Sequence, residues 1–137
     1  MNNISTMSNC PFCEEGILSR QTKNTEYKYK GHSQLLPQPG IYCSTCDEAI
    51  LEPSDLKYNR IQLQSFKSKV DGLLVPQEVK RIRKSLGLKQ GEAAKIFGGG
   101  HNAFSRYELG ELAVPKSMSL LLKILDQHKE IRKEVNL

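Results

Sequence analysis

A chain of 137 residues is long enough for one ordinary domain or two small ones, and 38% apolar and 26% charged residues suit a globular protein with modest cores. We expect a cytoplasmic protein without a membrane partner, because no apolar run approaches a membrane span and the first ten residues lack the features of a signal peptide. The net charge of +5 is uneven, +1 over residues 1–70 and +4 over residues 71–137. This excess favours a nucleic-acid partner, although many solvated surfaces are equally basic.

Two Cys-x-x-Cys pairs hold all four cysteines, Cys10 with Cys13 and Cys43 with Cys46. Since two thiolates on one turn lie close enough to share a metal, the pairs supply four soft ligands, which suit tetrahedral zinc and leave no open position for a substrate. We therefore predict one structural zinc ion per chain. A redox-active Cys-x-x-Cys and free buried thiols are the alternatives, but the strand-to-helix context of a thioredoxin-type site is absent around Cys10.

Residues 10–52 are predicted to form a small β-rich (α+β) domain around the zinc ion, and residues 1–9 to be disordered. The stretches 16–19 and 25–30 have the composition of short strands, and the prolines and glycine at 37, 39 and 40 indicate turns. The 29 residues between the cysteine pairs leave room for a hairpin or a small sheet. Metal binding would supply folding free energy that so small a unit cannot obtain from an apolar core.

A connecting helix is predicted over residues 53–72. Pro53 suits the first turn of a helix, and Gly72 suits its end. The apolar residues between them recur at roughly helical spacing, at Leu56, Ile61, Leu63, Phe66 and Val70.

The remaining residues, 73–137, are predicted to form an all-α domain that contains a helix-turn-helix. Helices are expected from Pro76 to Leu86, from Lys89 to Phe97, from His101 to Leu109 and from Pro115 onward, because glycines or prolines separate four amphipathic stretches. The second and third helices are short and joined by three glycines, which is typical of a helix-turn-helix. The fourth helix is expected to bury a broad apolar face, made of Leu120, Leu121, Ile124 and Leu125.

The third of these helices has polar residues on one face and aromatic residues on another, as a recognition helix does. Asn102 and Arg106 are four residues apart and point from one face, where Asn can pair with adenine and Arg with guanine. Phe104 and Tyr107 lie on another side, suited to packing on Ala93, Ala94 and Ile96 of the preceding helix. Supporting DNA contacts are assigned to Lys89, Gln90, His101 and Ser105. The alternatives are that Asn102 only caps the helix and that Arg106 is simply solvated.

Three stretches resemble known proteins. Residues 88–94 and 105–110 resemble the Xre/Cro family of phage-repressor-like (λ-repressor-like) helix-turn-helix domains. Residues 97–108 resemble more specifically the MqsA (YgiT-type) antitoxins of type II toxin–antitoxin systems, in which a zinc unit with two Cys-x-x-Cys pairs precedes this domain. The sequence departs from the family pattern at Lys89, where a Thr is common, and a lysine there keeps or strengthens a phosphate contact.

The resemblance implies a structural zinc ion on the four cysteines, a homodimer formed by the C-terminal domain, and a palindromic operator read by Asn102 and Arg106. It also implies that the N-terminal domain neutralises a cognate toxin, typically an mRNA-cleaving ribonuclease of RelE-like fold, and that the pair represses its own operon. A zinc-stabilised transcriptional regulator without a toxin is the alternative function. An enzyme is not expected, because the metal would have no open position and His32, His101 and His128 share no motif.

Overall fold

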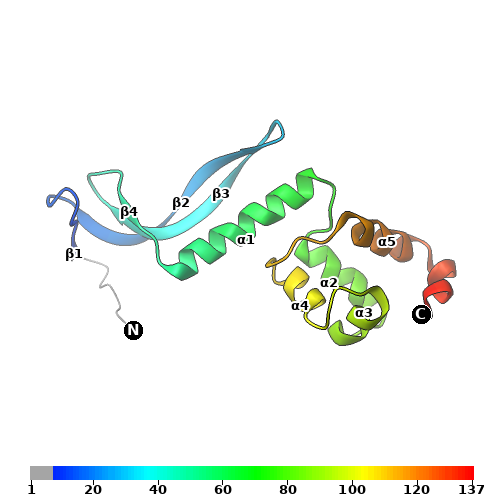
Figure 1. Cartoon of the computed structure of the whole chain (residues 1–137). Coiled ribbons are helices and arrows are strands. Elements are labelled where there is room, and N and C mark those ends of the chain that lie inside the picture. The colour runs from blue at the N-terminus through cyan, green and yellow to red at the C-terminus, as the bar shows by residue number, and fades with distance from the viewer. Residues whose placement is uncertain (1–7) are drawn as a thin grey trace. The chain divides into compact units, whose positions relative to one another are not determined.

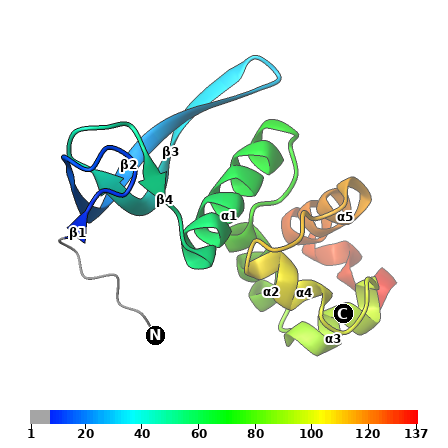
Figure 2. The ribbon, with the colours of Figure 1, turned by 60° about the vertical axis from the view of Figure 1, so that its left-hand side comes forward.

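The computed structural model describes residues 8–137, which divide into two compact units, one up to Leu63 and one from Gln64 to Leu137. The division falls inside the long helix α1 (Pro53–Val70), so its first half belongs to one unit and its second half to the other. Figures 1 and 2 show all the strands in the first unit and α2 to α5 in the second, and we call them the sheet unit and the helical unit. Within residues 8–137, no helix is long and apolar enough to cross a membrane.

The sheet unit contains a four-stranded antiparallel sheet in the order β1-β2-β3-β4. Its strands are β1 (Ser8–Asn9), β2 (Ile17–Tyr29), β3 (His32–Cys43) and β4 (Ala49–Ile50). The expectation of a disordered N-terminal segment is wrong for Ser8 and Asn9, which pair with Leu18 and Ile17. The rest of that expectation, residues 1–7, lies outside the described residues.

A long hairpin of β2 and β3 replaces the two short strands predicted from the sequence. Its register pairs Leu18 with Cys43 at one end and Tyr29 with His32 at the other. The turn residues 30 and 31 both have positive φ, as in the two-residue turns that match the twist of a hairpin. The stretches 16–19 and 25–30 therefore do not form separate strands. Both contribute to one continuous strand, which runs from residue 17 to residue 29.

Pro37 and Pro39, expected at turns, lie inside β3. They are two residues apart, so their nitrogens face the same edge of the strand. On the side away from β2, β3 pairs with β4 only at Ile41 and Tyr42. Prolines that face this open edge remove no ladder hydrogen bond, which is why the strand tolerates them.

Polar contacts fix the first half of α1 against the hairpin. Asp55 is buried in the first turn of α1, where its carboxylate accepts hydrogen bonds from Nη1 of Arg20 and from the backbone N–H of Glu52, both at 2.9 Å. One helical turn further on, the hydroxyl of Tyr27 donates to Oδ1 of Asn59 at 3.2 Å. The interface between helix and hairpin therefore rests partly on charged and polar groups.

The helical unit contains, besides the end of α1, the helices α2 (Pro76–Ser85), α3 (Gln90–Phe97), α4 (Ala103–Glu108) and α5 (Lys116–Gln127), followed by a short 3-10 helix, η1 (Lys129–Val135). α2 packs against α4 and α5, and α3 packs against α4. The core cluster consists of Leu74, Val79, Ile82, Ala93, Ala94, Ala103, Phe104, Tyr107, Val114 and Leu122. The predicted fold class, a small cysteine-bearing β-rich unit followed by an all-α unit, is confirmed.

Several apolar side chains predicted to be buried are instead exposed. Of the four residues expected on the buried face of α5, only Leu125 is buried. The others, Leu120, Leu121 and Ile124, are 50%, 37% and 45% exposed. Ile96 of α3 is also exposed, unlike the Ala93 and Ala94 that precede it. The apolar stripe of α5 is therefore wider than its contact with α2, and a second apolar face remains on the surface.

Candidate metal centre and DNA-reading helix

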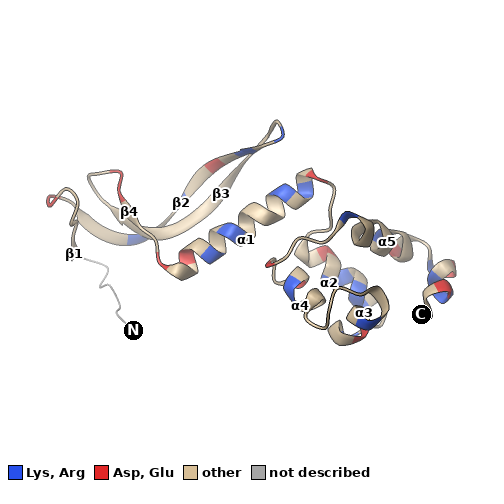
Figure 3. Cartoon of the chain, in the orientation of Figure 1, with Lys and Arg blue, Asp and Glu red and all other residues tan. Residues whose placement is uncertain are grey.

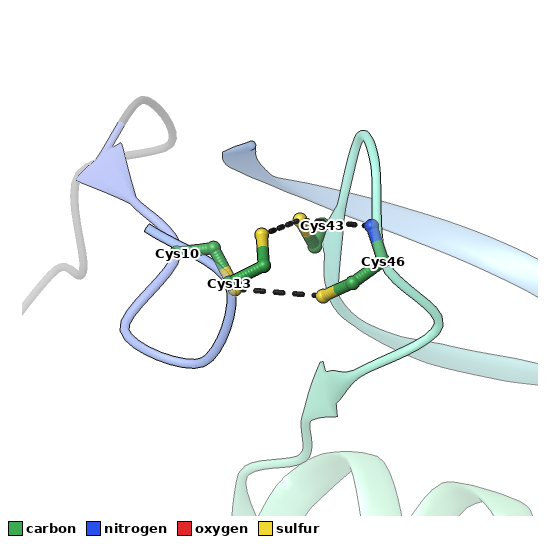
Figure 4. Close-up of side chains that lie close together, drawn as sticks. All are labelled: Cys10, Cys13, Cys43 and Cys46. Atoms are coloured by element: carbon green, nitrogen blue, oxygen red, sulfur yellow. Dashed lines mark hydrogen bonds between the residues drawn. The ribbon is translucent and has the colours of Figure 1, made fainter. Parts of the chain in front are cut away.

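The four cysteines come together at the end of the sheet opposite the hairpin turn, as Figure 4 shows in close-up. Their Sγ atoms all lie within 4.8 Å of one another, with 3.7 Å between Cys10 and Cys46 and 3.6 Å between Cys13 and Cys43. Four sulfurs placed tetrahedrally at about 2.3 Å from a zinc ion would be about 3.8 Å apart. The cluster is a four-cysteine metal site, as the spacing of the two pairs predicts.

Hydrogen-bond donors surround the sulfur atoms. Sγ of Cys43 accepts from the backbone N–H of Thr45 and of Cys46, and Sγ of Cys13 accepts from the N–H of Gly16, each at 3.4 Å. Oγ1 of Thr45 lies 3.4 Å from Sγ of Cys13 and 3.5 Å from Sγ of Cys43. Such donors stabilise the thiolate, which is the form of cysteine that binds a metal.

Gly16 and Thr45 are parts of this site that the cysteine spacing did not reveal. A Cβ atom added to Gly16 would overlap Sγ of Cys43 and Oγ1 of Thr45. Only glycine fits at this position. A glycine three residues after a Cys-x-x-Cys pair is the signal that could have pointed to it.

The hydrogen-bond donors, together with burial, give the cysteine thiols different pKa values. Hydrogen bonds from the backbone N–H of Cys46 and then from Thr45 lower the pKa of Cys43 to about 5. The hydroxyl of Thr45 is also the main group that lowers the pKa of Cys13. At Cys46, the N–H of Glu48 acts to lower the pKa, but burial and the neighbouring thiols outweigh it and raise the pKa to about 12. Because four thiolates this close repel one another, ionisation of all four requires a bound cation.

In the helical unit, α3 and α4 are joined by a glycine-rich turn and form the helix-turn-helix segment. Asn102 is the N-cap residue of α4, and its carbonyl accepts a hydrogen bond from the N–H of Arg106 at 3.1 Å. Both residues are exposed, and the side chain of Asn102 makes no capping hydrogen bond. Among residues 8–137, neither side chain has a hydrogen-bond or ion-pair partner, so both are available to a ligand.

The four residues expected to support DNA contacts lie near the starts of these two helices. Lys89 is the N-cap residue of α3, where its backbone N–H donates to Oε1 of Glu92 at 2.9 Å, and Gln90 is the first residue of α3. His101 precedes α4 and Ser105 lies in its first turn. Lys89 and His101 are exposed, whereas Gln90 and Ser105 are half-buried. Contact of these residues with DNA stays a prediction.

Phe104 and Tyr107 lie on the buried face of α4 and pack into the core of the helical unit. They are 0% and 3% exposed, and their rings meet edge to face with centroids 5.5 Å apart. A Cβ atom at Gly99, whose φ is +94°, would lie 3.0 Å from Cβ of Ala103 and 3.3 Å from Oη of Tyr107. The glycine therefore allows the turn to approach α4 closely. An ion pair between Arg83 and Glu108, which the sequence did not reveal, also joins α4 to α2.

A four-cysteine metal site on a small antiparallel sheet, followed by a helical unit with a helix-turn-helix segment, defines a two-module binding protein. Residues 8–136 match the family described as the antitoxin component of bacterial toxin-antitoxin systems, MqsA. Antitoxin MqsA of Escherichia coli (strain K12) is 37% identical over 128 residues, which cover 92% of this chain and 98% of the relative. The chain belongs to the MqsA antitoxin family, as predicted, and is an antitoxin rather than an enzyme.

A solved structure, that of the N-terminal domain of the E. coli protein MqsA, matches 47% of this chain and 98% of its own length at 26% identity. The TM-score is 0.40. At that value the likeness adds nothing to the fold described above.

Proposed function

We propose that this antitoxin neutralises its cognate toxin through the sheet unit and represses its own operon by binding palindromic DNA through the helical unit. The toxin expected is an mRNA-cleaving ribonuclease of RelE-like fold. Membership of the MqsA antitoxin family carries the proposal. The division of labour is supported by the two-unit organisation, since the metal site and the hairpin lie in one unit and the helix-turn-helix in the other.

The distribution of charge supports the assignment of DNA binding to the helical unit. This unit holds fourteen Lys and Arg against eight Asp and Glu, a net of +6, whereas the sheet unit holds six against seven, a net of −1. Figure 3 shows Lys and Arg on each of the helices α2 to α5. A polyanion is therefore attracted to the helical unit, where Asn102 and Arg106 would read bases and Lys89, Gln90, His101 and Ser105 would make supporting DNA contacts.

Zinc is the metal we assign to the four-cysteine site. Four thiolates in tetrahedral arrangement suit zinc, and the distances between the sulfur atoms agree with its bond length. With all four positions filled by the chain, the ion has a structural role. Elemental analysis of the purified protein should find one zinc per chain, whereas iron, which also accepts four thiolates, would colour the protein.

The exposed apolar face of α5 supports a homodimer. Leu120, Leu121 and Ile124 lie one and three residues apart, so they share one side of the helix and are too exposed to belong to the core. An isologous contact between two copies of this face would bury them. A two-fold dimer also matches the two half-sites of a palindromic operator.

Co-expression tests the toxin-binding part of the proposal. The toxin encoded beside this gene should arrest growth, and the wild-type antitoxin should relieve the arrest. Cys43→Ser should lose rescue because the sheet unit needs its metal, while an Asn102→Ala, Arg106→Ala double variant should keep rescue and lose repression. Repression by the wild type without any rescue would refute the antitoxin assignment and leave a regulator without a toxin.

A further inference from the structure

An open cavity of about 470 Å³ lies in the helical unit, lined by residues of the end of α1, of the loop that precedes α2, of α2 itself and of α5. Its volume falls within the range of about 300–1,000 Å³ that is typical of small-molecule sites. Four apolar side chains form its wall: Leu73, Leu74, Val75 and Ile82. Leu74 and Ile82 also belong to the core cluster and are 5% and 1% exposed, so this wall is held in place by the fold.

Arg81 neutralises the acidic side chains that line the cavity. Its Nη2 lies 2.9 Å from Oε2 of Glu78 and 2.9 Å from Oδ2 of Asp126, and its Nη1 donates to Oδ1 of Asp126 at 3.2 Å. These bonds to Arg81 lower the pKa of both carboxyl groups, so they stay ionised and paired at neutral pH. Neither carboxylate is free to bind a cation.

Two lysines at the rim are left without a counter-charge. Lys69 has no side-chain hydrogen bond or ion pair with residues 8–137. Nζ of Lys123 donates to the carbonyl oxygen of Gly72 at 2.8 Å, a contact that satisfies one proton and leaves the positive charge unbalanced. The cavity is lined by three cationic side chains and two carboxylates, which gives its lining a net charge of +1. The cations are Lys69, Arg81 and Lys123, and the carboxylates are Glu78 and Asp126.

We propose that this cavity binds an amphipathic monocarboxylate, an aliphatic acid of medium chain length. Its carboxylate interacts with Lys69 and Lys123, and its hydrocarbon tail covers the half-buried side chains of Leu73 and Val75. The single negative charge matches the net charge of the lining, and the tail removes exposed apolar surface from water. This inference goes beyond the antitoxin function and does not depend on it.

Octanoate is a suitable probe, because it is a soluble monomer with an eight-carbon chain. Titration of the full-length, metal-loaded protein by calorimetry should give saturable binding of one octanoate per helical unit, and octanoate should raise the melting temperature of that unit, since it binds only the folded form. Acetate, which lacks the tail, and octylammonium, which reverses the charge, should not bind. Equal binding of octylammonium, or no saturable binding of octanoate at millimolar concentration, would overturn the proposal.

Substitutions of the two lysines locate the site. Lys69→Gln and Lys123→Gln should each weaken octanoate binding at least about threefold, and together about tenfold, because each removes one charged partner of the carboxylate. Lys80→Gln, on the exposed side of α2 and outside the cavity, is the matched control and should bind as wild type does. Lys69→Gln should disturb the fold less than Lys123→Gln, because within residues 8–137 it removes no side-chain hydrogen bond or ion pair, whereas Lys123→Gln removes the hydrogen bond to Gly72. Unchanged affinity in the Lys69→Gln, Lys123→Gln double variant would place octanoate elsewhere.

Discussion

Arg83 of α2 and Glu108 of α4 form a bidentate ion pair inside the helical unit, with Nε to Oε2 at 2.9 Å and Nη2 to Oε1 at 2.8 Å. Their side chains are 10% and 6% exposed. Nη1 of Arg83 also donates to the carbonyl of Leu88 at 2.9 Å, so one guanidinium joins α2, the loop before α3 and the end of α4. Because α4 carries Asn102 and Arg106, the pair fixes the orientation of the proposed reading helix.

Removing one partner of this pair should destabilise the helical unit strongly. Glu108→Ala leaves the guanidinium of Arg83 buried without its counter-ion, which typically costs about 3–5 kcal/mol. Thermal or urea denaturation followed by circular dichroism would measure the loss. Glu78→Ala is the matched control, because the Arg81–Glu78 pair is exposed and should contribute less than about 1 kcal/mol. Similar losses in the two variants would contradict a structural role for the buried pair.

This ion pair is also a feature of the helical unit that the sequence alone does not predict. Arg83 and Glu108 are 25 residues apart, and a charged residue in a short helix is normally interpreted as solvated. The local pattern does predict the helix-turn-helix segment, since glycines separate its two helices and Phe104 and Tyr107 lie on the face that is buried. Which charged residues meet across the core depends on the tertiary packing of α2 against α4, which no local pattern encodes.

In the sheet unit, too, the sequence predicts some features and misses others. Four cysteines at Cys-x-x-Cys spacing predict the metal site without knowledge of the fold, because the chemistry of the ligands dictates that they meet. The hairpin was not predicted as one element, because Pro37 and Pro39 normally indicate turns and only strand pairing shows that they face an open edge. Gly16 and Thr45 were missed because their role is to leave space for, and donate to, sulfur atoms that are distant in sequence.

Operator binding should depend on the two exposed residues of the helix-turn-helix. Asn102→Ala and Arg106→Ala should each weaken specific binding by about 1–3 kcal/mol, because each removes a base-reading side chain. Fluorescence anisotropy with the promoter DNA of this operon at fixed salt measures the change. Lys133→Ala, at an exposed position of η1, controls for the loss of a positive charge. The assignment fails if both variants bind operator DNA as tightly as wild type.

Metal binding should be lost when a methyl group is added at Gly16. In Gly16→Ala the new Cβ overlaps Sγ of Cys43 and Oγ1 of Thr45, so the cysteine turns must move apart. Zinc content and the rate of zinc transfer to a chromogenic chelator are the readouts. Gly91→Ala is the control, because a Cβ there meets nothing within 4 Å and alanine in a helix is more stable by about 0.5–1 kcal/mol. Full zinc occupancy with wild-type kinetics in Gly16→Ala would show that the turn is looser than described.

Acid should weaken the attachment of α1 to the hairpin. The hydrogen bond from Arg20, with that from the N–H of Glu52, lowers the pKa of Asp55. A lowered pKa contributes stability that is fully present above the unfolded-state value of about 3.9 and is lost as the pH falls through the folded-state pKa. Urea denaturation of wild type and Asp55→Asn should therefore differ at pH 6 and converge towards pH 3. Curves that stay parallel as the pH falls would rule out the linkage.

A charge on the exposed face of α5 should separate the homodimer. Leu121→Lys and Ile124→Lys each place an ammonium group where the proposed interface buries an apolar side chain, and two-fold symmetry brings each substitution into the interface twice. Sedimentation velocity should show dimers for wild type and monomers for both variants at micromolar concentration. Leu56→Lys changes a leucine of α1 that is 51% exposed, and this variant should stay dimeric. Because two half-sites are bound by one dimer, the monomeric variants should also lose operator affinity while keeping the base-reading residues intact. Dimers that survive both α5 substitutions would place the interface on another face of the helical unit.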